Sequence, residues 1–417
     1  MQIHIKNIGI IKKAKIHVDG ITVITGENDS GKSTVGKILY STLNILSRFQ
    51  EEKTENQNKF ISKRLQKVLQ SLEFEKDIYN ETENYMLFRS DFKRNELINI
   101  RDRISNEINN SSESYKKSIL KYFDEIDEIY SNEKQQCFAK KLFATNLCNE
   151  FDGQIHNLEE KDNAIIKIIE NDRDVLSINF EINQIRELEI KKYSFFENVF
   201  FIDTPFIIDD LNKMIKFFPQ SEKILDNKKY DLIEKLRSNC DLDIFSKEAY
   251  LNRIKVINKK LSEIVSGEFE LDNNGLGYIR SGKRIHTNTM AAGLKIYSII
   301  KILLDNYWLN SSSLFIFDEP EIHLHPHWQI VLAELFAQLS QELNVHILVN
   351  THSPYFLRAL QIYTKKYAIE DNAHYYFAQK IDEFRSEIKN IDDDLGMTYA
   401  TLSKPFEDLE EISKIYM

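Results

Sequence analysis

The amino-acid sequence predicts an α/β fold with a mixed sheet and an inserted, mainly helical domain. The sheet is predicted by three short apolar runs that lead into small or polar residues, at 21–25, 314–318 and 345–350. The insertion is predicted by a stretch from residue 50 to about 190, which lacks proline and repeats apolar residues at helical spacing. We therefore expect a head domain formed by residues 1–49 and 195–417, interrupted by a helical insertion at 50–194.

The first apolar run leads into a glycine loop with the spacing G-x-x-x-x-G-K-[ST], which is the phosphate-binding loop pattern. Its glycines permit backbone angles that turn successive N–H groups toward phosphate oxygens. Lys32 supplies positive charge for the β- and γ-phosphates, and the Ser33 hydroxyl can ligate Mg²⁺. The alternative interpretation is a glycine turn without a ligand. The residues predicted to bind ATP are Gly26, Glu27, Asn28, Asp29, Ser30, Gly31, Lys32, Ser33 and Thr34.

Bulk properties limit the class of protein. The chain has 417 residues, a net charge of −10 and three scattered cysteines without a C-x-x-C pair, so neither a disulfide framework nor a zinc site is indicated. No apolar run approaches the ~18 residues that cross a bilayer, and the N-terminus lacks the apolar block of a signal peptide. We expect a cytoplasmic protein without a membrane partner. The negative net charge argues against a protein that binds nucleic acid over most of its surface, but it is compatible with a local basic groove.

Several elements can be placed along the first half of the chain. Period-2 alternation predicts strands around 3–6, 14–18 and 21–25. Asp19 and Gly20 predict a tight hairpin turn between the last two of these strands. The helix that follows the glycine loop is expected to end near Phe49. Within the insertion we expect helices, with loops at 50–57 and 107–113.

Strand patterns return in the second half. A strand is expected at 199–202, and a hairpin is expected from residues 267–271 and 276–280, turned by Asp272-Asn-Asn-Gly275. An amphipathic helix follows and is expected to end near Trp308.

The apolar run at 314–318 ends in two adjacent carboxylates, and the run at 345–350 is followed by Thr351 and His352. In an open α/β sheet the ligand binds at the carboxyl ends of the strands, so these side chains should meet the phosphate loop. Asp318 is suited to hold Mg²⁺ together with Ser33, and Glu319 is suited to activate the attacking water. His352 is placed to sense a γ-phosphate. We therefore predict Glu319, His352 and Lys32 as catalytic residues.

Three ordered motifs carry a family resemblance: G-E-N-D-S-G-K-S-T, L-F-I-F-D-E-P-E-I-H-L-H-P and N-T-H-S-P-Y-F-L. Together they resemble the P-loop ATPase head shared by the ABC-type SMC, RecF and OLD proteins. Within that group the chain looks most similar to bacterial anti-phage ATPases of the Septu PtuA kind. The resemblance covers about 1–45 and 195–417, and it implies an ABC-type head with ATP and Mg²⁺ as cofactors.

The resemblance further implies a head-to-head dimer, with ATP held between one phosphate loop and the signature motif of the other copy. The candidate signature consists of Ala292, Gly293 and Lys295 at a helix start, and it departs from the usual Ser-Gly-Gly pattern. Ala292 has no hydroxyl for the γ-phosphate. No glutamine follows the strand at 199–202, where such heads often place one, so Asp203 or Thr204 would take its place.

The implied function is an ATP-hydrolysing, homodimeric or larger switch linked to DNA, in phage defence beside a separate nuclease of the HNH or another type. The acidic segment 391–417 and the insertion are the expected docking surfaces for that partner. Two alternatives remain open: an ATP-binding scaffold that scarcely hydrolyses, favoured by the altered signature, and a transporter ATPase subunit, disfavoured by the insertion.

Three other patterns have structural interpretations. His323, His325 and His327 alternate, but without nearby acidic or thiol ligands they favour packing and hydrogen bonding over a metal site. Asp392-Asp-Asp394 is interpreted as a solvated charge run, because too few residues follow His352 for a Toprim nuclease fold. The aromatic stretch 355–378 is interpreted as sheet and core.

Overall fold

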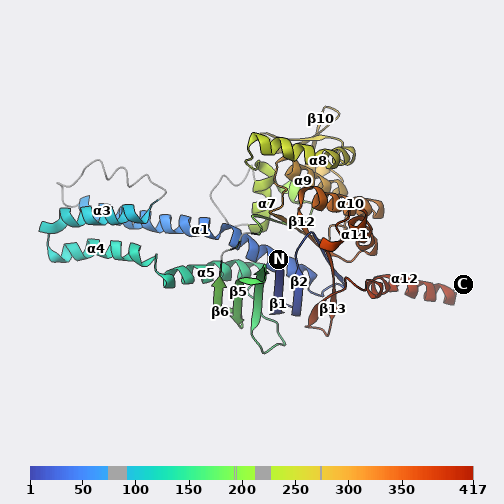
Figure 1. The fold of residues 1–417 in the computed structure, drawn as a ribbon, viewed down its shortest axis with the longest axis horizontal. Helices are drawn as coiled ribbons and strands as arrows, with labels where there is room; N and C mark the ends of the chain where they lie inside the picture. Colours follow the sequence, from blue (N-terminus) through green and yellow to red (C-terminus); the bar gives the residue numbers. More distant parts are fainter. Residues whose placement is uncertain (74–91, 192, 194, 212–226, 273–274, 417) are drawn as a thin grey trace. The chain divides into compact units, whose positions relative to one another are not determined.

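The computed structural model describes residues 1–73, 92–191, 193, 195–211, 227–272 and 275–416. The chain divides into two compact units, the first formed by Met1–Ser47 and Asn146–Met417 and the second by Arg48–Thr145. Each unit has its own arrangement of helices or strands (Figure 1).

The first unit is built on a mixed sheet in the order β6-β5-β4-β1-β2-β14-β13-β3-β12-β11-β7. Five neighbouring strands in this order pair in parallel: β13 (Ala373–Lys380), β3 (Ile21–Gly26), β12 (His346–Thr351), β11 (Ser313–Asp318) and β7 (Asn198–Ile202). β3, β11 and β12 are buried over nearly their whole length. Because both faces of such strands are covered, their sequences are nearly continuous apolar runs. The predicted α/β fold with a mixed sheet is confirmed.

The other half of the sheet is mainly antiparallel. Its strands are β6 (Gln184–Ile190), β5 (Arg173–Glu181), β4 (Ala164–Glu170), β1 (Gln2–Ile8) and β2 (Ile11–His17). β14 (Ser386–Asn390) joins the two halves, because it pairs with β13 antiparallel and with β2 in parallel. The expectation that residues 164–190 are helical is therefore wrong. Burial alternates along β4, where Ala164, Ile166 and Ile168 are buried on one face and the residues between them are partly exposed.

The predicted hairpin between the second and third strands is also wrong. β2 pairs with β1 instead, and β3 is flanked by β12 and β13. Gly20 has φ +47°, and a Cβ there would lie 2.2 Å from the Asn372 carbonyl oxygen. The glycine is needed for this close approach where the chain enters the parallel half of the sheet.

Helices pack against the parallel strands. The largest apolar core joins side chains of β3, β7, β11, β12 and β13 to side chains of the helices α7 (Asn227–Arg237), α8 (Ile244–Ile264), α9 (Ala292–Asp305), α10 (Pro326–Leu343) and α11 (Pro354–Lys366). Phe317 of β11 stacks on Phe336 of α10 with ring centroids 4.5 Å apart. The first turns of α1 (Lys32–Glu73) approach Ile316 and Phe201, and a Cβ on Gly36 would lie 2.9 Å from Ile316. Gly36 therefore allows α1 to pack closely on the sheet.

A separate three-stranded antiparallel sheet contains β8 (Glu268–Asp272), β9 (Gly275–Arg280) and β10 (Lys283–His286). The predicted pairing of 267–271 with 276–280 is confirmed, and β10 is an addition that the sequence analysis did not predict. The last helix, α12 (Gly396–Tyr416), follows β14.

The second unit is helical. Its members are the later part of α1, α3 (Arg94–Glu107), α4 (Glu113–Glu128) and most of α5 (Asn132–Glu150). Side chains of α1, α3 and α4 form its core, centred on Leu65, Ile104 and Phe123. The α1 helix continues to Glu73, so the loop predicted at 50–57 is wrong, whereas a break between α3 and α4 lies within the predicted 107–113 loop. The predicted division at residues 49 and 194 stays a prediction.

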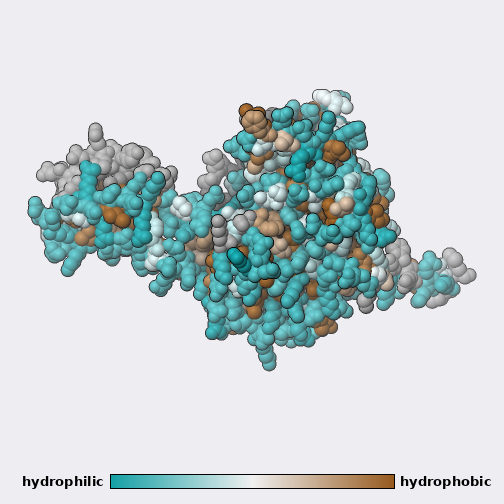
Figure 2. All heavy atoms as spheres, viewed as in Figure 1, coloured by the Kyte–Doolittle hydropathy of each residue, from teal (hydrophilic) through white to brown (hydrophobic). Residues whose placement is uncertain are grey.

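No helix within the described ranges combines the length and apolarity needed to span a membrane. The face of the molecule seen in Figure 2 is mostly hydrophilic, with hydrophobic residues in small separate groups.

Candidate functional site at the carboxyl edge of the parallel strands

The glycine loop connects the end of β3 to the start of α1. Gly26 has φ +145°, and a Cβ there would lie 2.4 Å from the Ala378 carbonyl oxygen of β13. Gly31 has φ +91°, and a Cβ there would lie 2.8 Å from Ile11. Both positions therefore require glycine, because the backbone angle is unfavourable for other residues and there is no room for a side chain. This supports a phosphate-binding loop over an ordinary glycine turn.

Lys32 lies under this loop. Its side chain is buried, and its Nζ donates hydrogen bonds to the carbonyl oxygens of Gly26 at 3.1 Å and Glu27 at 2.6 Å. Burial lowers the pKa of Lys32, while the nearby carboxylates of Glu319 and Asp318 act in the opposite direction. The ammonium is thus held among backbone oxygens, facing the acidic pair.

The remaining loop residues divide by exposure. Glu27, Asn28 and Asp29 are exposed at the tip, and Asp29 accepts a hydrogen bond of 3.2 Å from Lys380. Ser30 is buried and donates to the Glu27 carbonyl at 2.7 Å. Thr34 is partly buried in the first turn of α1.

Ser33, Asp318 and Asn350 meet although they come from three elements. Ser33 Oγ donates to Asp318 Oδ1 at 3.0 Å, and Asn350 Nδ2 donates to the same oxygen at 2.8 Å. The strand register places Asp318 opposite Asn350 at the carboxyl ends of β11 and β12. Asn350 is fully buried. In the sequence Asn350 is only a polar residue at a strand end, and its pairing with Asp318 becomes visible only from the strand register.

Glu319 and His352 follow these strand ends. Glu319 has φ +52°, an unusual backbone angle for a non-glycine residue, and its N–H donates to the Asn350 carbonyl at 2.9 Å. His352 Nδ1 lies 3.3 Å from Glu319 Oε1, and the His352 side chain is 44% exposed. The two predicted catalytic groups therefore lie side by side, with the imidazole open to solvent.

Glu321 is a buried acidic residue of the site that the sequence analysis missed. Its Oε1 accepts hydrogen bonds from the Thr351 hydroxyl and from the His352 N–H, the latter at 3.1 Å. Burial raises the pKa of Glu321. The carboxyl group thereby fixes the backbone on which His352 sits. The sequence feature that could have identified Glu321 is its position in the motif D-E-P-E, three residues after Asp318.

Asp203 and Thr204 follow the carboxyl end of β7. Ile202 lies opposite Phe317, so Asp203 continues the edge that carries Asp318. Asp203 is exposed, and Thr204 Oγ1 accepts a hydrogen bond of 3.3 Å from the Phe206 N–H. Their predicted role in place of a glutamine stays a prediction.

The three candidate signature residues lie at the start of α9. Ala292 and Gly293 are partly exposed, and Ala291 caps the helix without a side-chain hydrogen bond. Lys295 differs: its side chain is buried, forms an ion pair with Asp209 and lies 4.8 Å from the Phe206 ring centroid. Its ammonium is used within its own chain and does not point outward. The structure therefore separates Lys295 from the surface that Ala292 and Gly293 form.

The three alternating histidines have packing and capping contacts. His323 packs edge-on against Phe206, and His325 caps α10 by accepting the His327 N–H.

Asp392 accepts the Tyr375 N–H at 2.5 Å, and Tyr375 and Tyr376 are buried in β13. Within the described ranges no three His, Cys, Asp or Glu side chains form a group that could hold a metal ion.

The donor set suits a nucleotide with Mg²⁺. A hydroxyl and a carboxylate oxygen, 3.0 Å apart, are hard oxygen ligands of the kind Mg²⁺ prefers. Backbone N–H groups of the glycine loop and the positive end of α1 suit phosphate oxygens. When bound, Mg²⁺ would neutralise phosphate charge, and Ser33 and Asp318 are the residues that would hold it.

A glycine loop leaving a central parallel strand, with an acidic pair at the same sheet edge, defines a phosphate-loop nucleotide-binding protein. The chain belongs to the AAA ATPase domain family, whose model matches residues 1–357. A comparison with curated proteins finds no match.

Solved structures similar to this chain include SMC head domains. The SMC head domain from Thermotoga maritima is 12% identical with a TM-score of 0.39, covering 94% of this chain and 98% of that chain. An SMC head bound to the C-winged helix domain of ScpA is 14% identical with a TM-score of 0.39, covering 95% and 98%. An SMC head with an extended coiled coil, derived from Pyrococcus furiosus and bound to the C-terminal domain of ScpA, is 14% identical with a TM-score of 0.36, covering 99% and 98%.

Proposed function

We propose that the chain binds ATP with Mg²⁺ and hydrolyses it at the carboxyl edge of the parallel strands. One observation carries the proposal: Ser33 and Asp318 share a hydrogen bond of 3.0 Å, while Glu319 and His352 lie beside them. In this proposal Lys32 binds the β- and γ-phosphates, Glu319 accepts a proton from the attacking water, and His352 orients the γ-phosphate. Membership of the AAA ATPase domain family supports it.

ATP binding and turnover by three variants test this proposal. Lys32→Ala should weaken ATP binding, because it removes the buried cation beneath the loop. Glu319→Gln should retain ATP and lose turnover by roughly 10²-fold or more, because the general base is absent. Glu263→Gln is the matched control, since it makes the same change of charge on an exposed side chain of α8, outside the loop. Wild-type turnover in Glu319→Gln would refute the assignment of the base.

We further propose that two copies close around ATP, with Ala292 and Gly293 of one copy facing the phosphate loop of the other. The start of α9 supports this, because its N-cap Ala291 is exposed and supplies no side-chain hydrogen bond to the first N–H groups. Such a helix end favours an anion through its free N–H groups and dipole.

We propose DNA as a further partner, bound on the solvent face of the antiparallel half of the sheet. Lys6 lies directly opposite Lys13, and His4 lies opposite both Lys15 and Lys167. Lys6 is paired with Asp162 and Lys167 with Asp174, whereas Lys13 and Lys15 have no carboxylate partner among the described residues and are available to a phosphate backbone. Burial, together with Lys15 and Lys167, lowers the pKa of His4.

Binding of duplex DNA at several salt concentrations tests this surface. Lys13 and Lys15 are exposed and form no ion pair within the described residues, so changing both to Glu should leave the fold intact. The double variant should lose DNA affinity and show a shallower salt dependence. Lys255→Glu with Lys259→Glu, on exposed positions of α8, is the matched control. Equal losses in both double variants would argue against a specific face.

The biological setting we propose is phage defence with a separate nuclease effector of the HNH or another type. The three ordered motifs support this through their resemblance to anti-phage ATPases. The purified chain should leave phage DNA intact with Mg²⁺ and ATP, and restriction of phage should require a nuclease encoded beside it. Metal-dependent cleavage by the chain alone would contradict the proposal.

The second candidate is a scaffold that binds ATP and scarcely hydrolyses it. Ala292 favours it, because that position has no hydroxyl for a γ-phosphate. Steady-state ATP turnover, measured with and without DNA, separates the two. Tight ATP binding without turnover in either condition would establish the scaffold.

A further inference from the structure

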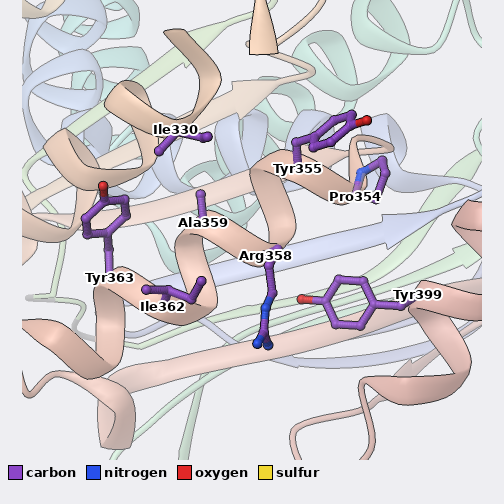
Figure 3. Close-up of a pocket in the computed structure, with 8 residues that line it drawn as sticks. All are labelled: Ile330, Pro354, Tyr355, Arg358, Ala359, Ile362, Tyr363 and Tyr399. Carbon is purple, nitrogen blue, oxygen red and sulfur yellow. The ribbon is translucent and has the colours of Figure 1, made fainter. Parts of the chain in front are cut away.

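An open apolar groove of about 720 Å³ lies between α10, α11 and the start of α12. Three of its hydrophobic side chains are exposed: Ile330 by 39%, Tyr355 by 52% and Ile362 by 49%. Figure 3 shows them around the groove, with the Arg358 guanidinium and the Tyr399 hydroxyl close together at one side. Exposed apolar residues gathered in one groove are typical of a binding surface.

The α12 helix changes character along its length. Its first turns pack on the core of the first unit through Tyr399 and Leu402, next to the core residue Leu395, which directly precedes the helix. Further along, Leu409 is 62% exposed and Ile412 is 51% exposed. These two residues are three positions apart and therefore share one face of the helix. The second half of α12 thus presents an apolar stripe that no described residue covers.

The charges of the groove and of the helix are complementary. Asp408, Glu410 and Glu411 are exposed beside the apolar stripe of α12, and Lys414 in the last turn is the one exposed cation among the described side chains of this half. Arg358 and Lys365 are exposed on α11, and within the described part of the chain neither forms an ion pair with a carboxylate. Arg358 donates a hydrogen bond of 2.5 Å to the neutral Gln361 side chain. The groove therefore offers the Arg358 guanidinium, with Lys365 further along the same helix, where α12 offers carboxylates.

We propose that the second half of α12 docks into the groove of a second copy of this chain. The same helix cannot fill its own groove, because Tyr399 already lines that groove and Leu409 lies ten residues, or about 15 Å, further along a straight helix. Each copy has one helix and one groove, and in the two-fold arrangement that we propose each helix enters the groove of the other copy. None of the residues lining the groove belongs to the phosphate loop or to the start of α9, so this contact is expected to form without ATP.

Disulfide trapping between copies tests this contact directly. One copy carries Ile362→Cys and the other, tagged for size, carries Leu409→Cys, and both carry Cys137→Ser because Cys137 is exposed. Mixed without nucleotide and oxidised, the pair should give a covalent heterodimer. Ile381→Cys replaces Ile362→Cys as the control, since Ile381 is 47% exposed outside the groove. A yield no greater than that control would overturn the proposal.

Sedimentation of the full chain without nucleotide provides the second measurement. Arg358→Glu should weaken self-association by roughly tenfold, because the two-fold contact loses a favourable charge pair twice. Combining it with Glu411→Arg should restore association. Leu409→Asp with Ile412→Asp should give a folded monomer, since both positions are exposed. A wild-type chain that stays monomeric at high concentration, or a dimer unaffected by these changes, would refute the contact.

Discussion

Ser33 and Asp318 are joined by a hydrogen bond of 3.0 Å although they are 285 positions apart in the chain. The first lies at the start of α1 and the second at the end of β11. The bond brings together the hydroxyl and the carboxylate that are suited to Mg²⁺, and neighbouring residues hold this arrangement in place.

Asn350 should be a positioning residue for Asp318. Its buried amide donates to Asp318 Oδ1 at 2.8 Å, so Asn350→Ala should free the carboxylate to rotate. The Mg²⁺ concentration needed for half-maximal ATP turnover should rise by about 10–100-fold, as for other residues that orient metal ligands. Asn252→Ala on an exposed position of α8 is the control. An unchanged Mg²⁺ dependence would show that Asp318 is held by other contacts.

Glu321 should position His352 through the backbone. Glu321→Ala leaves the Thr351 hydroxyl and the His352 N–H without this buried acceptor, at a cost of about 1–3 kcal/mol for each unpaired group. Glu321→Gln keeps an acceptor oxygen and should retain most of the stability and turnover. Thermal unfolding and ATP turnover of the two variants provide the measurements. Equal behaviour of the two variants would contradict the acceptor role.

Glu334 should make part of the folding stability depend on pH in the acid range. Burial acts to raise its pKa, but hydrogen bonds from Lys260, Lys366 and Tyr367 lower it from 4.5 to about 2. A lowered pKa in the folded state stabilises the protein above about pH 4.5, and this contribution is lost as the pH falls toward 2.

Glu334→Gln should therefore reduce the free energy of unfolding at neutral pH by about 1–2 kcal/mol, allowing for solvent screening of a partly exposed group. The difference from wild type should shrink as the pH falls below 4.5. Glu342→Gln, on the same helix and without an ion pair among the described residues, is the control. A difference that stays constant with pH would mean that the effect is not electrostatic.

Complementation should reveal whether the ATP site is shared between two copies. Ala292→Glu places a negative charge at the start of α9, which suits the helix dipole and so should not disturb the fold. It should nevertheless repel a phosphate presented by another copy. Gly293→Glu is less suitable alone, because a Cβ there lies 3.1 Å from Leu324 and 3.3 Å from the His323 carbonyl.

Each of Ala292→Glu and Lys32→Ala should lose turnover alone. A mixture should regain part of it, since a heterodimer contains one intact site. Ala292→Gln is the neutral control for side-chain size. Full turnover by isolated Ala292→Glu would contradict the shared site.

Much of the parallel half of the sheet could be predicted locally. β3, β11 and β12 are buried strands whose apolar runs lead into the functional side chains, and both features follow from short stretches of sequence. The antiparallel half of the sheet was harder to predict from the sequence. Residues 164–190 lie in a helix-rich region of the chain, and their assignment to strands depends on pairing β4 with β1, more than 150 positions away.

The phosphate loop with its lysine, and the order of the acidic and histidine motifs, were determined by the sequence alone, because each depends on neighbours within a few residues. Only the tertiary structure decided which groups meet: Asn350 on Asp318, Glu321 beneath His352, and Lys295 buried against Asp209, 86 positions away. A lysine in the first turn of a helix has the same local pattern whether it faces solvent or the core. Its direction depends on what packs against the helix, and residues distant in the chain supply that packing.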